Sequence, residues 1–377
     1  MLKIINFIQV QACDGLGLTS LEFVNTSAHS DSSCVLSGVG LKPDVCVYAK
    51  KSGRQRHTDF SRMEISIKFK CESIQDAFVD PPSASNRNRH SFERDSDQGK
   101  DTRGQLIAYA SAQMETQFRT FCFTVKLCGS MARLIRWDHS GAVVTSAFDY
   151  GKNADLLAQF FWRYSHMDSA SRGKDSSVVD SNAADAQRAC TKLGVLMSTR
   201  IFKVHVPNDA LEFNGDPKLV DGYEERQRSQ IPNYFAAAPT YRGRCLGGRF
   251  TRTFPIYDKT SNRILLLKDT WRVDRDDFEK EGQVYAALKA ANVPYVAELI
   301  QAGDILAHKT ETQNLVSKFA CKLDEALMLP HRHYRLVLDT IGTLLWQFIS
   351  LLNLFRQYGM RSKVGSHHVT LLAVIFD

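Results

Sequence analysis

The sequence lacks the cysteine pattern of a disulfide-bonded or zinc-binding protein. Its nine cysteines are scattered along 377 residues, their number is odd, and no C-x-x-C pair occurs. A disulfide framework and a Cys-rich zinc site are therefore not expected. This cysteine usage predicts a reducing intracellular compartment, either cytoplasmic or nuclear.

Long apolar segments are also missing. The first residues, "MLKIINFIQVQACDG", have no extended apolar centre and no cleavage-like site of small residues, which argues against a secretory signal. The most apolar window, residues 341–355, contains Gln347 and Asn353 and is shorter than a bilayer-spanning helix. We expect no membrane contact.

Two catalytic patterns are absent as well. No G-x-S-x-G elbow occurs, so a hydrolase nucleophile of that type is not indicated. The histidines His331, His333, His367 and His368 lack the paired spacing of metal ligands. We interpret them as surface residues, and the sequence predicts no metal site.

What the sequence does contain is the composition of a globular protein with room for two domains. Its content is 44% apolar and 24% charged. The 48 Lys and Arg residues exceed the 41 Asp and Glu residues, for a net charge of +7. This mild excess favours phosphates, nucleic acid or acidic partners without selecting one of them.

The periodicity predicts an α+β organisation. Strands are expected at 44–48 and 63–69, a helix within 103–118, a strand within 119–129, a hairpin with its turn at Asp138 to Gly141, and a helix after Asn153. The expected boundaries are an amino-terminal mixed domain at 1–166 with a flexible polar insertion at about 80–102, a polar linker at 167–194, a second domain at 195–345, and an atypical tail at 346–377.

The second domain contains a charge pair of interest. Lys268 ends an apolar strand, and Glu281 follows within a helix expected from about Asp276 to Ala290. That helix has an apolar stripe formed by Phe278, Val284, Tyr285 and Leu288, and Glu281 falls on the same face. A buried carboxylate needs a cation, and Lys268 can supply one. The alternative is that Glu281 only borders the stripe and reaches solvent.

A glycine-rich turn precedes this pair. It holds Gly243, Gly247 and Gly248 among several arginines, without the G-x-G-x-x-G spacing. Glycine permits close approach of the backbone to a phosphate, but it equally permits a tight hairpin. The pattern alone leaves both interpretations open.

Six strings, in this order, resemble the fungal-type protein kinase family: "RGQLIAYASAQ", "ARLIRWDHSGAVVTSAFDY", "LLAQFFWRYSH", "LLLKDTWRVD", "EGQVYAAL" and "HYRLVLDTIGTLL". The resemblance covers roughly residues 40–345. It implies an α+β amino-terminal region followed by a kinase-like small lobe, an antiparallel sheet with one main helix. It also implies ATP-dependent phosphorylation of protein Ser/Thr, with ATP and Mg²⁺ as cofactors and a protein as substrate or partner.

The resemblance also assigns residues. Lys268 matches the strand lysine of protein kinases and Glu281 its helix partner. Gly243, Gly247 and Gly248 match the nucleotide loop. Val337, Leu338 and Asp339 fall in the hinge, Val337 to Ile341, where adenine would bind.

The chain departs from a protein kinase in its catalytic motifs. Neither an H-R-D catalytic loop nor a D-F-G sequence is present, and only a short stretch follows Leu344. We therefore expect a chain truncated before the catalytic loop, without the large lobe and inactive in phosphate transfer. A pseudokinase or protein-interaction module is the alternative, and exposed small-lobe surface would favour self-association.

A third interpretation is a degenerate PD-(D/E)-x-K nuclease in the amino-terminal domain. Asp44 follows Pro43, and Lys70 ends a strand, but Lys68 stands where a metal-binding acid is usual; Glu64 on the same face is a substitute carboxylate. Exposed structural lysines are the simpler explanation. Aromatic residues near basic ones, at 118–123 and 134–138, fit alternating core positions better than base stacking, so nucleic-acid binding is not expected.

Overall fold

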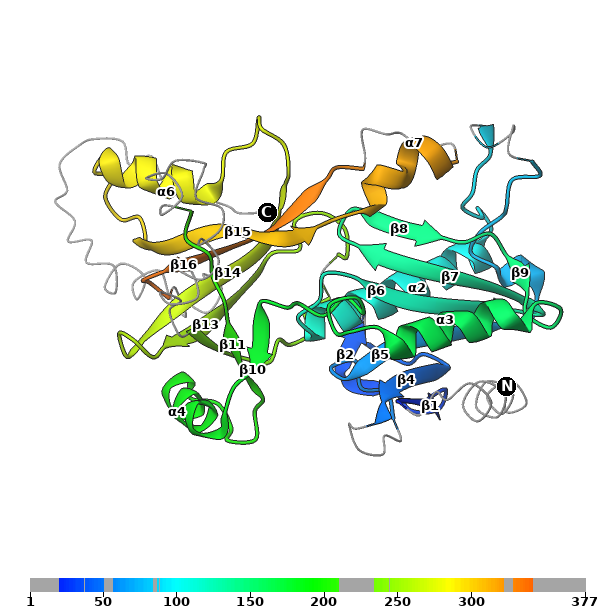
Figure 1. Ribbon diagram of the computed structural model, residues 1–377, viewed down its shortest axis with the longest axis horizontal. Helices are drawn as coiled ribbons and strands as arrows, with labels where there is room; N and C mark the ends of the chain where they lie inside the picture. Colours follow the sequence, from blue (N-terminus) through cyan, green and yellow to red (C-terminus); the bar gives the residue numbers. More distant parts are fainter. Residues whose placement is uncertain are drawn as a thin grey trace. The chain divides into compact units, whose positions relative to one another are not determined.

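The computed structural model describes residues 20–36, 38–50, 57–83, 87, 89–209, 234–243, 245–321 and 328–341. Within these ranges the chain forms an α+β fold with two seven-stranded sheets, one two-stranded sheet and five α-helices (Figure 1). All these elements belong to Met1–Asp339, one of two units into which the chain divides. The α+β class expected from the periodicity is confirmed.

The amino-terminal sheet has the strand order β1-β4-β5-β6-β7-β8, with β9 paired to β7. Its strands are β1 (Leu21–Asn25), β4 (Val45–Ala49), β5 (Met63–Lys70), β6 (Cys122–Cys128), β7 (Met131–Asp138), β8 (Gly141–Val144) and β9 (Phe148–Asp149). Helix α2 (Asp97–Thr116) joins β5 to β6, which run parallel, as a crossover connection allows. A small sheet of β2 (Asp31–Leu36) and β3 (Val39–Leu41) lies between β1 and β4 in the sequence.

Both faces of the amino-terminal sheet bury apolar side chains, because successive residues of a strand point to opposite faces. Ile65 and Ile67 of β5 pack in one cluster with Phe161 of α3 (Ala154–His166). Leu106 and Met114 of α2 pack in another cluster with residues of β6 and β7. The predicted hairpin is confirmed, since Asp138 pairs with Gly141 across the β7–β8 turn.

The polar segment at 80–102 differs from the expected flexible insertion. Phe92 stacks on Phe78 with ring centres 5.0 Å apart, and Glu93 forms a bridge with Phe78. Helix α2 begins at Asp97, where the Ser96 side chain accepts a hydrogen bond from the Gly99 backbone. One apolar residue and a good N-cap are enough to order this part of the segment.

The polar stretch at 167–194 also contains regular structure. Strand β10 (Val178–Asp180) and helix α4 (Ala183–Leu193) form there, and Asp175 is buried. Asn182 caps α4 by accepting a hydrogen bond from the Asp185 backbone, and Gly194 ends it with a left-handed φ of 67°. This stretch is therefore part of the fold and not merely a linker.

The second sheet is antiparallel, with the order β10-β11-β12-β13-β14-β16-β15. Its remaining strands are β11 (Ile201–Val204), β12 (Tyr234–Ala237), β13 (Arg252–Asp258), β14 (Arg263–Val273), β15 (Leu299–Lys309) and β16 (His331–Leu338). Helix α6 (Glu281–Ala290) lies between β14 and β15 in the sequence, and the short α7 (Val316–Phe319) follows β15. Leu265 and Leu267 of β14 lie in the apolar core on one face, whereas Leu266 faces the side of α6.

Helix α6 differs from its prediction. It begins at Glu281, five residues later than expected, and none of its residues is buried. Phe278 lies before the helix and is 49% exposed, and Val284 is 40% exposed. The preceding Lys280 is the physical reason, since its Nζ lies 2.6 Å from Asp209 Oδ2 and 2.9 Å from Asp304 Oδ2, which fixes the point where the helix starts.

Candidate functional site

Lys268 and Glu281 form a close ion pair. Lys268 Nζ lies 2.7 Å from each carboxylate oxygen of Glu281. Strand alternation places Lys268 on the same face of β14 as Leu266, toward α6. Glu281 is the first residue of α6, where unpaired backbone N–H groups and the helix dipole favour a carboxylate. The structure therefore brings together the two residues that the sequence singled out.

The environment of this pair separates it from an ordinary surface ion pair. The side chains of Lys268 and Glu281 are 12% and 19% exposed, whereas those of Lys289 and Glu298, also paired at 2.7 Å, are 71% and 54% exposed. Solvent-exposed pairs contribute little because water and salt screen them. Removing one partner of a largely buried pair leaves a charge without compensation.

Tyr334 and Gly282 hold Glu281 at this position. The Gly282 backbone N–H donates to Tyr334 Oη at 3.0 Å, and burial raises the pKa of Tyr334, so its hydroxyl stays neutral. A Cβ atom at position 282 would lie 2.6 Å from Tyr334 Oη and 3.0 Å from Ala302 Cβ. Only glycine permits this close approach of the helix to the sheet. Sequence reasoning missed both residues, although a glycine in the first turn of a helix is a usable signal.

A second ionic cluster fixes the start of α6. Asp304 of β15 accepts from Arg272 Nε at 2.8 Å and pairs with Lys280. Burial opposes ionisation of Asp304, but Arg272 and Lys280 outweigh it and hold its pKa below the ordinary value. The three charges connect β14, β15 and the residue that precedes the helix.

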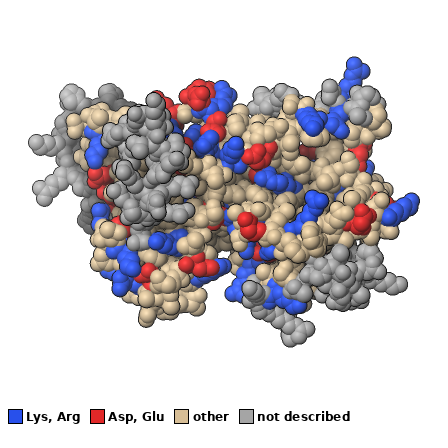
Figure 2. Space-filling model, viewed as in Figure 1, with Lys and Arg blue, Asp and Glu red and all other residues tan. Residues whose placement is uncertain are grey.

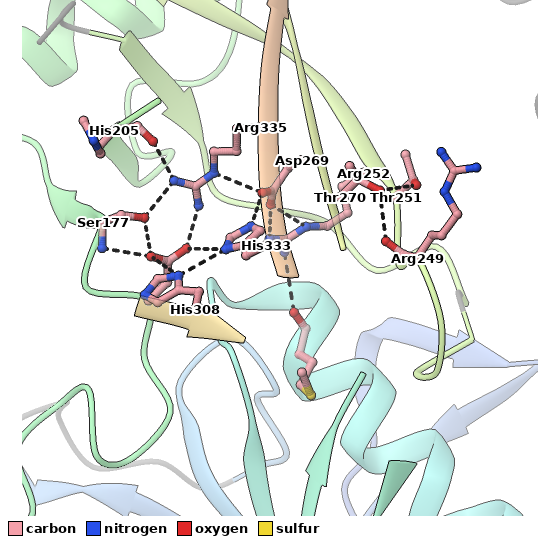
Figure 3. Close-up of polar contacts among 12 residues, drawn as sticks. Ser177, His205, Arg249, Thr251, Arg252, Asp269, Thr270, His308, His333 and Arg335 are labelled. Atoms are coloured by element: carbon pink, nitrogen blue, oxygen red, sulfur yellow. Dashed lines mark hydrogen bonds and ion pairs between the residues drawn. The ribbon is translucent and has the colours of Figure 1, made fainter. Parts of the chain in front are cut away.

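The opposite face of β14 carries a buried charge network around Asp269 (Figure 3). Arg252 Nη2 lies 2.5 Å from Asp269 Oδ2, Arg335 Nε lies 3.0 Å from Oδ1, and His333 Nε2 also contacts Oδ1. Arg335 continues to Asp175, with Nη2 2.6 Å from Oδ2. Burial disfavours the charged form of Asp269, yet His333, Arg335 and Arg252 hold its pKa well below the usual range.

The network joins β14 and β16 to segments that precede them in the sequence. Arg335 Nη1 donates to Ser177 Oγ at 2.8 Å and to the His205 carbonyl at 2.7 Å. Arg252 Nη1 donates to the Gln117 carbonyl, just after α2, at 3.1 Å. Lys268 and Asp269 are neighbours on one strand, so the strand that presents the lysine to α6 is anchored through its other face.

Three groups of this network have the side chains of a metal site. The ligand atoms of Asp175, His308 and His333 lie within 4.8 Å of one another. The two Nδ1 atoms are 3.2 Å apart, within hydrogen-bond distance, and the nearly parallel ring planes differ by 13°. That is the geometry of a direct hydrogen bond between the imidazoles, and Asp175 is already bonded to Arg335. The cluster is satisfied without a metal ion.

The histidines at 331 and 333 are buried, which corrects their expected surface position. His331 is 6% and His333 is 2% exposed. Trp271 stacks on His333 with ring centres 4.8 Å apart and parallel planes. Both histidines lie on β16, which is hydrogen-bonded to β14 on one side and to β15 on the other, and a polar sequence pattern does not reveal their burial.

The glycine-rich turn lies between β12 and β13. Gly243 and Gly248 adopt φ angles of 72° and 84°, which favour glycine. The Gly248 backbone N–H donates to the His139 carbonyl at 2.8 Å, and His139 Nδ1 donates to the Leu246 carbonyl at 2.8 Å. Burial lowers the pKa of His139 to about 3, so its ring is neutral. The turn is hydrogen-bonded to the β7–β8 hairpin. Contact of Gly243, Gly247 and Gly248 with a phosphate stays a prediction.

The three hinge residues do not share one face. Val337 lies in the apolar core with Leu267, on the side of the sheet opposite to Lys268. Leu338 pairs with Leu266 and lies in the cluster beside α6, on the side of Lys268. Asp339 Oδ1 accepts from the Glu298 backbone at 2.8 Å. The structure therefore separates the Val337 side chain from any site that includes Lys268.

The carboxylates of the nuclease interpretation are both engaged by cations. Asp44 Oδ2 lies 3.1 Å from Lys68 Nζ. Glu64 is buried and lies 3.1 Å from Arg119 Nη2 and 2.7 Å from Lys174 Nζ. Burial opposes its ionisation, but these two cations lower the pKa of Glu64 to about 2. The geometry thus gives no support to a metal held between Asp44 and Glu64.

The comparison with protein families identifies the class of this chain. The model of the family described as fungal protein kinase matches residues 87–326. The match covers more than half of the sequence, so the chain belongs to the fungal protein kinase family. No curated protein and no solved structure matches the chain. Within the described residues, no helix has the length and apolar character needed to cross a membrane.

Proposed function

We propose that this chain carries the nucleotide-binding part of a fungal-type protein kinase, with Lys268 contacting the phosphates of ATP and Glu281 orienting Lys268. The family's parent activity is then the ATP-dependent phosphorylation of protein Ser/Thr. The observation that carries the proposal is the Lys268–Glu281 ion pair, 2.7 Å long and largely shielded from solvent.

The sheet topology supports this assignment. Strands β12, β13, β14, β16 and β15 are consecutive neighbours, and α6 is inserted between β14 and β15. A lysine on the third strand of this set, paired with a glutamate of the following helix beneath a glycine-rich turn, is the protein-kinase arrangement. We infer a kinase-like small lobe from about 195 to 345, preceded by a domain of the same family.

The chemistry of the pair suits phosphate binding. The Lys268 ammonium has three donor hydrogens, and the two Glu281 oxygens hold it from one side. In the family, ATP with Mg²⁺ supplies the phosphoryl group. The sequence has no H-R-D or D-F-G, which protein kinases use to receive the hydroxyl proton and bind magnesium. We therefore propose that these 377 residues bind nucleotide without transferring phosphate.

Nucleotide binding is tested with a fluorescent ATP analogue titrated into the chain in the presence of Mg²⁺. Lys268→Met should weaken binding at least tenfold, because the phosphates lose their cation. Lys289→Met is the matched control, since it removes a lysine of an equally short but exposed ion pair nearby. Equal affinities of wild type and Lys268→Met would reject the site. Incorporation of radiolabelled phosphate into a generic protein substrate, lost in Lys268→Met, would reject the inactive assignment.

A second candidate is a protein-interaction module. It rests on exposed apolar residues of the second domain: Tyr295, after α6, is 97% exposed and Leu306 of β15 is 62% exposed. Exposed apolar groups of this kind mark contact surfaces. The test compares the sedimentation of the wild type with that of the double variant Tyr295→Ser, Leu306→Ser. It asks whether the chain associates with itself through these residues. A dimer that the double variant abolishes favours association, and a monomer in both cases rejects self-association through this surface.

A further inference from the structure

The tip of the β7–β8 hairpin connects the amino-terminal sheet to the glycine-rich turn. His139 lies at this tip and is 1% exposed, although turn residues usually face solvent. Its backbone carbonyl accepts a hydrogen bond from the Gly248 N–H at 2.8 Å, and its ring Nδ1 donates to the Leu246 carbonyl at 2.8 Å. One residue of the first sheet therefore holds the turn at two points.

The His139 ring is packed against two aromatic side chains. Its centre lies 4.6 Å from that of Phe250, which follows the turn, and 4.5 Å from that of Trp271 on β14. Among the described residues, Nε2 of the ring has no hydrogen-bond partner, so the bond from Nδ1 to Leu246 is the polar contact that orients the ring. The imidazole is neutral, and the carbonyl acceptor requires its single N–H to be on Nδ1.

The apolar residues of the turn are buried in the core of the amino-terminal domain. Leu246 and Phe250 are 4% and 7% exposed, and they lie in one cluster with Met114 of α2 and Trp137 of β7. Phe250 also has a left-handed φ of 40°, which is unfavourable for a bulky residue. Such a conformation persists only where its surroundings fix it. Side chains of the first sheet and of α2 thus determine the shape of a turn that belongs to the second sheet.

The hairpin tip is also anchored to the chain between β15 and β16. Asp138 Oδ2 accepts hydrogen bonds from the backbone N–H groups of Glu311 and Thr312, each at 3.0 Å. Ser140 Oγ donates to the Leu329 carbonyl at 2.6 Å. These two residues flank the histidine, so contacts outside the turn fix its position.

The turn leads into the strand that lies beside Lys268. Strand β13 begins shortly after Gly248, and its Thr253 is in register with Lys268. The Trp271 N–H donates to the Arg249 carbonyl at 2.7 Å, which keeps the segment after the turn paired with β14. On the face seen in Figure 2, basic and acidic side chains are interspersed. Phosphate binding on such a face depends on groups that the fold places, and not on an extended basic surface.

We infer, on the basis of the proposed function, that His139 is a positioning residue for the glycine-rich turn, through which the amino-terminal domain sets the affinity of the kinase-like lobe for nucleotide. A turn held in one conformation binds phosphate without the entropy cost of ordering a loop. The D-H-S-G tip at 138–141 belongs to one of the strings that resemble the family, and it thereby acquires a role in the nucleotide site.

The test is titration of the intact chain with a fluorescent ATP analogue and Mg²⁺, using two variants that separate the ring from its donor. His139→Phe keeps an aromatic ring but loses the hydrogen bond to Leu246, so it should weaken nucleotide binding at least about fivefold. His139→Asn keeps an N–H donor near the position of Nδ1 and should bind within about twofold of wild type. The melting temperatures should have the opposite order, because His139→Asn loses the ring contacts with Phe250 and Trp271.

His166→Phe is the matched control. His166 also stacks on a tryptophan, Trp162, with ring centres 4.4 Å apart, and its Nδ1 donates to the Trp162 carbonyl at 2.8 Å. It is exposed and lies at the end of α3, so the control should bind nucleotide as wild type does.

Hydrogen exchange of the turn backbone, residues 245–250, gives a second readout that needs no nucleotide. Exchange there should be faster in His139→Phe than in wild type and unchanged in His166→Phe. Unchanged exchange or unchanged affinity in His139→Phe, or affinities that follow the melting temperatures, would overturn the inference while leaving binding through Lys268 intact. If His139→Asn does not fold, the affinity and exchange of His139→Phe decide the outcome. Absence of nucleotide binding by the wild type would reject the proposed function and, with it, the role of His139.

Discussion

The two seven-stranded sheets differ in how their faces are covered. In the amino-terminal sheet, α2 and α3 bury apolar side chains on opposite faces. In the second sheet one face packs against an apolar core and the Asp269 network, whereas α6, on the other face, has no buried residue. A sheet covered on both faces is a scaffold, and a sheet with one loosely covered face keeps polar groups such as Lys268 within reach of a ligand.

The largest effect should come from the anchor of the second sheet. Asp269→Asn leaves Arg252 and Arg335 buried with less compensation and should lower the free energy of unfolding by about 3–5 kcal/mol. Asp274→Asn is the control, because Asp274 pairs with Arg332 nearer the surface and should cost less than about 1 kcal/mol. Denaturant titration measures both. Equal losses would show that the network does not anchor the sheet.

The next effect compares the two helix contacts directly. Phe161 of α3 is buried and packs edge-on against Phe23, so Phe161→Ala should cost about 3–4 kcal/mol. Val284→Ala on α6 should cost less than about 0.5 kcal/mol, because Val284 is exposed. Both values come from equilibrium unfolding in urea. A large loss for Val284→Ala would mean that α6 is covered as firmly as α3.

The smallest effect depends on pH and concerns Glu64 in the amino-terminal sheet. Its pKa is lowered from 4.5 to about 2 in the folded state. The unfolded chain therefore binds this proton more readily, and the stabilisation, about 3 kcal/mol, is present above pH 4.5 and is lost as the pH falls toward 2.

The measurement for Glu64 is the free energy of unfolding across that acidic range. Wild type should lose stability more steeply than Glu64→Gln, which carries no titrating group at this position. Parallel pH profiles of the two proteins would show that Arg119 and Lys174 do not stabilise the ionised carboxylate. The comparison reports on the amino-terminal part of the fold, since Glu64 lies on β5, Arg119 just before β6 and Lys174 in the segment that follows α3.

Local patterns predicted part of the fold. The Asp138–Gly141 hairpin turn and the strands around Lys268 follow from alternation and turn residues, which act over a few positions. Asp175 was assigned to a polar linker and His333 to the surface, yet both are buried. Their burial depends on Arg335 and Asp269, residues distant in sequence, and no local pattern contains that information.

The sequence by itself determined that Lys268 lies on an apolar strand and that Glu281 follows near a helix, because side-chain periodicity is a local property. The expectation that Lys268 ends this strand is wrong, since β14 continues to Val273 through its pairing with β16. Tertiary structure decided the rest. Gly282 must meet Tyr334 for Glu281 to reach Lys268, and Val337 is turned away from that pair by the register of β16. These contacts join strands and a helix that are separated along the chain, so only the folded sheet could set them.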